Sequence, residues 1–282
     1  MKEITANMIK ELRERTGVGM GKCKEALVSA EGDVEKAIDL LRKAGMAAAG
    51  KKEGRETKEG LILAEEDKDH ILLIEANAET DFVVQNERFV NFVQDCAHQA
   101  LQTKATSLEQ LLEQPYQKDK TISIDNYRNL VVQALGENIL VRRIELIKKD
   151  PNSSYGIYSH MGGKLVVLVE LNGAVGEESV AKEIGMHIAA ENPDFISSTE
   201  IPADVISREE DIARSQVQGK PENMIDKIVS GKLKAFYDQV CLLNQKYVKD
   251  STLTVEQFVD SISKKLGKPL SVKCFWRWKV GQ

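Results

Sequence analysis

The sequence predicts an α+β fold, and three features along the chain lead to this prediction. Short helical patterns open the chain. A unit of two strands, a connector and a helix then occurs twice, and a pair of further helical patterns follows the second copy. With 282 residues, the chain is long enough for two or three compact units, each with its own core.

Residues 1 to about 45 predict three short helices around a thin core. Thr5 is placed to cap the first helix, and Gly45 is expected to end the third. A bundle of this size is marginally stable alone, and small bundles of this shape commonly serve as docking modules, here of the ubiquitin-associated type. Residues 46–59 combine glycine with alternating charge and predict a linker.

The internal repeat defines the core of the protein. Its first copy begins GLILAEEDKDHILLIEAN and passes through ETDFVVQ into the helical stretch ERFVNFVQDCAHQAL. Its second copy begins YGIYSHMGGKLVVLVELN and passes through GAVGEE into SVAKEIGMHIAAENP. A two-stranded hairpin is not stable alone, so each helix must cover its own antiparallel sheet. Residues 138–147 and 272–280 are predicted to add a third strand to the first and second sheet.

Residues 200–236 predict a helical hairpin that turns at Gly219-Lys220-Pro221. Its first helix has few apolar residues, so the hairpin is expected to project from the body as an arm for a partner. The predicted domains are an N-terminal module with its linker at 1–55, a first core subdomain at 56–148, a second core subdomain at 149–199 plus 237–282, and the coiled-coil hairpin at 200–236.

Composition is that of an ordinary soluble protein. Hydrophobic residues make up 42% and charged residues 29%, and the net charge of −5 argues against a dedicated nucleic-acid binder. The charged start MKEITANMIKELRER is not a signal peptide, and no apolar run approaches the roughly 20 residues that cross a bilayer. We therefore expect a cytoplasmic protein with reduced cysteines and without membrane or nucleic-acid partners.

No pattern for catalysis is present. The chain lacks G-x-x-x-x-G-K-[ST], G-x-G-x-x-G and H-E-x-x-H, so it is predicted to be neither a GTPase nor a zinc protease. Its four histidines are scattered without metal-ligand spacing. The sequence therefore predicts no enzyme activity, no cofactor and no metal site.

The connector of the first repeat, residues 77–83, differs from its counterpart in the second. It is more polar, and it places the aromatic Phe82 beside the carboxylate of Asp81 in a loop, where binding residues are common. The structural alternative is that Phe82 packs under the following helix while Asp81 caps a nearby helix end.

Four separated segments together resemble the elongation factor Ts family over essentially the whole chain. They are LRERTGVGMGKCKEAL at 12–27, TDFV at 80–83, GENILVRRI at 136–144 and MHIAAENPDFI at 186–196. The resemblance implies an N-terminal helical module, two related core subdomains and a coiled-coil hairpin. It also implies a partner, elongation factor Tu in its nucleotide-free or GDP-bound form, and an activity, guanine nucleotide exchange during translation elongation.

The resemblance carries individual residues with it. Asp81 and Phe82 match a pair that enters the GTPase near its Mg²⁺ and nucleotide, and Thr80 and Val83 frame this pair. The metal and the nucleotide belong to the partner. Further family contacts match Lys10, Arg13 and Met20 in the N-terminal module, and His160 in the second hairpin. Gly21 departs from the family, which often has a second methionine there, so part of the apolar contact is missing.

Two other classes of function stay open. A docking or chaperone-like binding protein without exchange activity would use the N-terminal bundle. A nucleic-acid binder would use the basic and aromatic side chains near the C-terminus, namely Lys273, Phe275, Arg277 and Lys279.

Overall fold

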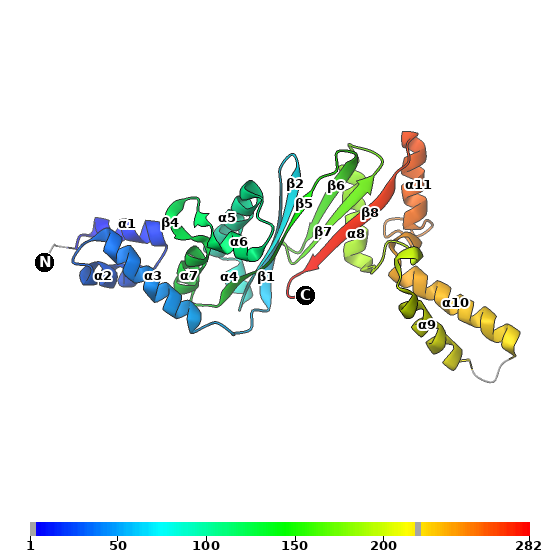
Figure 1. Ribbon diagram of the computed structural model, residues 1–282, viewed down its shortest axis with the longest axis horizontal. Helices are drawn as coiled ribbons and strands as arrows, with labels where there is room; N and C mark the ends of the chain where they lie inside the picture. The colour runs from blue at the N-terminus through cyan, green and yellow to red at the C-terminus, as the bar shows by residue number, and fades with distance from the viewer. Residues whose placement is uncertain (1–3, 218–220) are drawn as a thin grey trace. The chain divides into compact units, whose positions relative to one another are not determined.

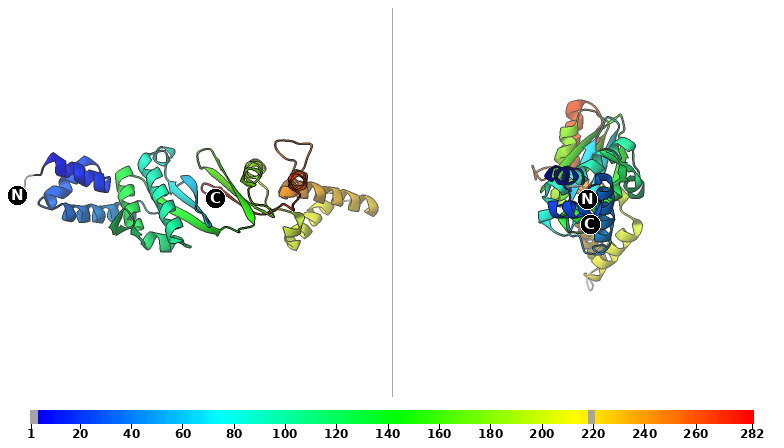
Figure 2. Two further views of the ribbon diagram at one scale, coloured as in Figure 1. Left: turned by 90° about the horizontal axis from the view of Figure 1, so that it is seen from above. Right: turned by 90° about the vertical axis from the view of Figure 1, so that its left-hand side faces the viewer.

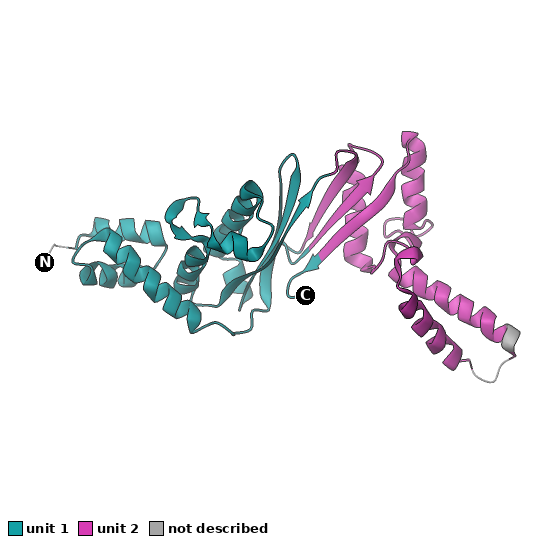
Figure 3. Ribbon diagram, viewed as in Figure 1, with its two compact units in different colours: residues 1–149, 161–165, 278–282 teal, residues 150–160, 166–277 magenta. Residues whose placement is uncertain are grey.

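The computed structural model describes residues 4–217 and 221–282. The chain divides into two compact units (Figure 3). The first comprises residues 1–149, 161–165 and 278–282, and the second comprises residues 150–160 and 166–277. Gly219 and Lys220, at the predicted hairpin turn, lie outside the described residues.

Three helices open the chain, as predicted (Figure 1). They are α1 (Ala6–Thr16), α2 (Met20–Ser29) and α3 (Val34–Gly50). The Thr5 side chain accepts a hydrogen bond from the Met8 amide at 3.3 Å, and Gly17 ends α1 in the left-handed conformation with φ 69°. The local capping signals therefore set the bounds of the first helix.

The predicted end of the third helix at Gly45 is wrong, because α3 continues to Gly50. Gly45 packs against the later helix α7 (Ile124–Leu135), where an added Cβ would lie 3.3 Å from the backbone oxygen of Asn129. This glycine permits a close approach of two helices and does not end one. Residues 46–50 of the expected linker are consequently helical.

The first sheet has the strand order β1-β2-β5. Its strands are β1 (Glu59–Glu66), β2 (His70–Ala78) and β5 (Ile139–Lys148), and both pairings are antiparallel. Ala78 at the end of β2 pairs with Glu59 on one side and with Ile139 on the other. The third strand predicted at 138–147 is therefore confirmed. The connector that follows β2 leaves the sheet at the same point where β5 enters it.

Helices cover this sheet and close the first core. The helix α5 (Glu87–Thr103) contacts both β1 and β2, and its Phe89 and Phe92 side chains are fully buried. The remaining elements of the unit are α4 (Asp81–Val84), α6 (Leu108–Glu113), β3 (Pro115–Tyr116) and β4 (Asp119–Ser123).

The second sheet repeats this design with the order β6-β7-β8. Its strands are β6 (Ser153–His160), β7 (Leu165–Asn172) and β8 (Ser271–Lys279). In both sheets the third strand joins beside the second, so the internal repeat extends to topology. Two helices, α8 (Glu178–Glu191) and α11 (Val255–Leu266), share one hydrophobic core with β7 and are seen end-on in the left view of Figure 2.

Two further helices form the predicted pair, α9 (Ala203–Ser215) and α10 (Glu222–Val240). They pack on each other through the buried residues Ala213, Val217 and Val229. Short 3₁₀ turns, η1 (Ser198–Glu200) and η2 (Leu242–Asn244), lie on either side of the pair in the chain. Its predicted role as an arm for a partner stays a prediction.

Candidate functional site

The connector after β2 presents a phenylalanine to solvent. Thr80 caps the four-residue helix α4, and its hydroxyl accepts a hydrogen bond from the Val83 amide at 3.5 Å. Val83 is buried in the first core, whereas Asp81 is exposed and Phe82 is 82% exposed. The alternative that Phe82 packs under the following helix is therefore wrong. Most of the apolar surface of Phe82 is therefore open to solvent.

Two carboxylates hold this connector in place. Glu137 accepts hydrogen bonds from the Thr80 hydroxyl at 2.6 Å and from the Thr80 amide at 3.0 Å. In the opposite direction, Glu79 accepts from the Asn138 amide at 2.7 Å and pairs with Arg55 at 3.4 Å. The exposed pair of Asp81 and Phe82 thus projects from backbone that is bonded on both sides.

The N-terminal residues predicted to contact a partner are also exposed. Lys10 and Arg13 lie on α1, one helical turn apart, and Met20 begins α2 with 54% of its surface exposed. A Cβ added to Gly21, which follows, would meet no atom within 4 Å, so the fold leaves room for a larger side chain at this position.

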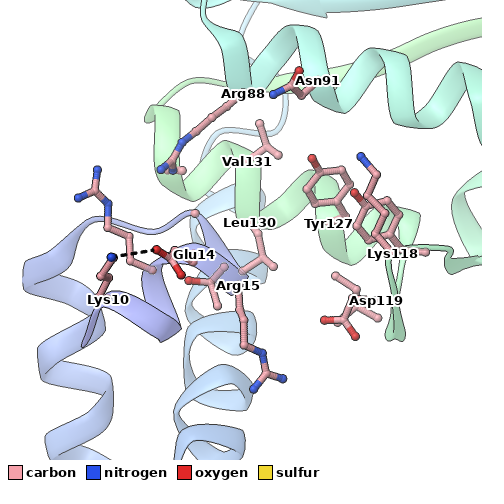
Figure 4. Close-up of a pocket in the computed structure, with 16 residues that line it drawn as sticks. Lys10, Glu14, Arg15, Arg88, Asn91, Lys118, Asp119, Tyr127, Leu130 and Val131 are labelled. Atoms are coloured by element: carbon pink, nitrogen blue, oxygen red, sulfur yellow. Dashed lines mark ion pairs between the residues drawn. The ribbon is translucent and has the colours of Figure 1, made fainter. Parts of the chain in front are cut away.

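A groove of about 840 Å³ runs beside α1 within the first unit (Figure 4). Its apolar side chains come from the β3–β4 hairpin and from α7, and Tyr116 and Tyr127 stack there with ring centroids 4.3 Å apart. Burial raises the pKa of Tyr127 to about 12, with the carboxylate of Asp95 adding to the effect, so this phenol stays neutral. The two stacked rings therefore give the groove an uncharged, largely apolar patch.

Positive charge dominates the described lining of this groove. Its charged members are Lys10, Arg13, Arg15, Arg88 and Lys118, against the carboxylates of Glu14 and Asp119.

Most of these cations already have acidic neighbours. Arg15 pairs with Glu35 at 2.7 Å, and Lys118 pairs with Asp95 at 2.6 Å. Arg13 has no ion-pair partner among the residues that the structure describes. The same holds for Arg88, whose Nη1 lies 3.0 Å from where a Cβ on Gly17 would be. The described part of the groove thus has unpaired positive charge at Arg13 and Arg88, which would complement an acidic surface.

His160 belongs to the second unit, as the last residue of β6. It is exposed, its ring lies 5.9 Å from that of Tyr158, and its Nδ1 is 3.1 Å from the Tyr158 hydroxyl. The neighbouring Met161 is 69% exposed with φ 50°. This turn therefore offers an imidazole and an apolar side chain to solvent.

Three of the four side chains named for nucleic-acid binding, those of Lys273, Phe275 and Arg277, are paired or partly buried, whereas Lys279 is exposed. Lys273 pairs with Glu170 at 2.8 Å and with Asp150 at 3.4 Å. Burial lowers the pKa of Arg277, and Phe275 packs against the core of the second unit. Nucleic-acid binding needs an exposed basic strand, and among these four side chains Lys279 is the exposed cation without an ion pair in the described structure, so the nucleic-acid alternative has little support.

Within the described parts of the chain, no three side chains of the types His, Cys, Asp and Glu gather as a metal site would require. Of the helices described, none has both the length and the apolar content to span a membrane. No disulfide forms among the described residues, and Cys23, Cys96 and Cys241 are buried. Burial raises the pKa of the Cys96 thiol far above its ordinary value, so the thiol stays protonated and packs as a small apolar group.

Comparison with known proteins decides the family. The sequence model described as Elongation factor TS matches residues 79–282. The chain belongs to the elongation factor Ts family. It is 54% identical over 282 residues to elongation factor Ts of Protochlamydia amoebophila, and 43% and 44% identical over 281 residues to the proteins of that name from Chlamydia felis and Chlamydia caviae. Each alignment covers 100% of both chains, so the relationship extends to the N-terminal module, and membership makes the chain a translation elongation factor.

Within this elongation factor Ts fold, two residues of the site were not predicted from the sequence. Glu137 lies in the motif GENILVRRI, which marks the family, yet its bond to Thr80 joins positions 57 residues apart. Arg88 occupies the first turn of α5, where charge is ordinary. Only the pairing of β2 with β5 could have pointed to Glu137, and no local pattern could have pointed to Arg88.

Proposed function

We propose that this chain is a guanine nucleotide exchange factor for elongation factor Tu. The observation that carries the proposal is the exposure of Phe82 on a braced connector, at the position where the family places its intruding pair. The substrate of this activity is a protein complex, the GTPase with bound GDP, and no covalent bond is made or broken.

The two side chains suit two different tasks. Phe82 is a rigid apolar wedge that can enter between helices of the GTPase and displace them. Asp81 carries a charge that can compete for the polar groups around the partner's Mg²⁺ and that repels the anionic nucleotide. Thr80 and Val83 hold this pair, one as the helix cap and the other as the buried anchor.

Exchange follows from thermodynamic linkage. A factor that binds the nucleotide-free GTPase more tightly than the GDP-bound form must weaken GDP binding by the same ratio. To invert a population from about 1:99 to about 99:1 takes roughly 5.5 kcal/mol of differential binding. One aromatic and one carboxylate are too few for this, so a larger interface must contribute.

We assign that larger interface to surfaces of both units. In the first unit, Lys10, Arg13 and Met20 would hold the GTPase domain. In the second unit, His160 would contact the phosphate-binding side, and the α9–α10 pair would extend the contact. Because the chain would work with the GTPase in translation, we assign it to the cytoplasm. We also propose that it binds no cofactor, metal, nucleic acid or membrane of its own.

Stopped-flow release of a fluorescent GDP analogue from elongation factor Tu tests the proposal. The expected result is release that accelerates with the concentration of this chain until it saturates. If a folded chain leaves the release rate of its cognate GTPase unchanged, the exchange function is refuted and the docking alternative gains support.

A further inference from the structure

The connector that carries Asp81 and Phe82 is held by a pair of crossed carboxylates. Ala78 and Ile139 are paired where β2 ends and β5 begins. Beyond this pair, the chain leaving β2 and the chain entering β5 run alongside each other. Glu79 accepts the amide hydrogen of Asn138, and Glu137 accepts the amide hydrogen of Thr80. Each carboxylate thereby takes the place of the ladder bond that the sheet no longer supplies.

Glu137 also orients the cap of α4. The Thr80 hydroxyl has one hydrogen, and it donates this hydrogen to Glu137 at 2.6 Å. Its lone pairs are then left for the Val83 amide, which donates to it at 3.5 Å. One carboxylate therefore fixes both polar groups of Thr80, and through the hydroxyl it supports the first turn of α4.

This support matters because α4 is too short to be stable by itself. It has only four residues, whereas isolated helices shorter than about 12 residues are marginal in water. Phe82 is 82% exposed, so its own packing contributes little to its direction. The direction of Phe82 depends on the cap at Thr80 and on the buried side chain of Val83.

The location of Glu137 is itself set by the fold. It follows Gly136, which ends α7 in the left-handed conformation with φ 82°, and it lies two residues before the start of β5 at Ile139. The short turn between α7 and β5 therefore places the Glu137 carboxylate beside the end of β2. Asn138, the next residue, donates its side-chain amide to the backbone oxygen of Arg55 at 3.0 Å and so ties the segment after α3 to the same place.

We propose that Glu137 is a positioning residue for nucleotide exchange. It does not touch the GTPase; it holds Thr80 so that Asp81 and Phe82 project in one fixed direction, and binding energy from the rest of the interface is then transmitted to the nucleotide site. This role rests on the proposed exchange function. It requires that loss of Glu137 lowers the maximal rate of GDP release more than it lowers affinity for the GTPase.

The test compares three variants of the full chain in stopped-flow GDP release and in binding to nucleotide-free elongation factor Tu. Glu137→Ala is expected to lower the saturating release rate by about tenfold, since hydrogen bonds to a charged group are lost, while affinity changes by less than about threefold. Glu137→Gln is expected to recover most of the rate, because its amide oxygen can still accept from the Thr80 amide and its NH₂ can donate to the hydroxyl. Glu66→Ala removes an ion pair with Lys149 at the opposite end of the β1–β2 hairpin and should leave the rate unchanged.

Hydrogen exchange of the Thr80 and Val83 amides, measured by NMR on the free chain, supplies a readout that does not depend on the partner. Both amides are expected to exchange faster in Glu137→Ala than in wild type, and at the wild-type rate in Glu66→Ala. A thermal melt with wild-type cooperativity confirms that Glu137→Ala is folded.

The outcomes separate the two proposals. A wild-type chain that fails to accelerate release refutes the exchange function, and with it the role of Glu137. If wild type accelerates release and Glu137→Ala does so equally well, the positioning role alone is overturned. The same conclusion follows if rate and affinity fall in equal proportion while the Thr80 and Val83 amides stay protected.

Discussion

Replacement of Phe82 by alanine tests the centre of the proposed mechanism. Because 82% of the side chain is exposed in the free protein, its removal leaves no cavity. The free energy of unfolding should therefore change by no more than about 0.5 kcal/mol. Any large loss of activity in this variant must come from the complex and not from the fold.

The size of that loss follows from the area that Phe82 still has to bury. Full burial of a phenylalanine is worth about 1.5–3 kcal/mol. With roughly four-fifths of the side chain exposed, about 1–2.5 kcal/mol remains for the complex, which corresponds to a roughly 5- to 70-fold slower maximal release of GDP.

The assay is stopped-flow release of a fluorescent GDP analogue, with affinity for nucleotide-free elongation factor Tu measured in parallel. Val175→Ala is a matched control, since Val175 is an exposed apolar residue, 67% exposed, in the second unit. We expect Phe82→Ala to lower the rate more than the affinity and Val175→Ala to change neither. An unchanged release rate in Phe82→Ala would refute the wedge mechanism.

Three further predictions concern other parts of the molecule. Gly156→Ala should destabilise the second unit by about 1–3 kcal/mol in a urea titration, because its Cβ would lie 2.2 Å from the Lys182 backbone nitrogen. Gly231→Ala is the control: its Cβ would lie in open space on α10, and the substitution should raise the free energy of unfolding by about 0.5–1 kcal/mol. Burial lowers the pKa of His187, although the Gln245 hydrogen bond opposes this, so the unfolded chain takes up the proton first and stability should decline below about pH 6.5; a His187→Gln variant whose urea midpoint declines as steeply between pH 7 and pH 5 would contradict this. Arg13→Glu should slow association with the GTPase and reduce its dependence on salt while the saturating release rate is kept, and an unchanged association rate constant would show that the groove does not face an acidic surface.

Much of the fold could be predicted from the chain because its signals are local. Thr5 and Gly17 bound α1 through hydrogen bonds within a few residues. Short runs of strand-forming residues located the strands of each sheet, and alternation of apolar and polar residues marked the strand near the C-terminus. The repeat of hairpin, connector and helix was visible because each copy must bury its own apolar face. The motif at 80–83 located the candidate site for a related reason, since its residues are contiguous.

Interactions between distant segments decided the rest. Gly45 is a stop signal when read locally, yet α3 passes through it because α7 packs closely there. The exposure of Phe82 depends on which side chains fill the core beneath α4. The hydrogen bonds from Thr80 to Glu137 form because β2 lies beside β5. Local sequence specifies which backbone bonds form within an element. The direction in which a side chain finally points is set by packing and pairing across the fold, which residues nearby in sequence do not encode.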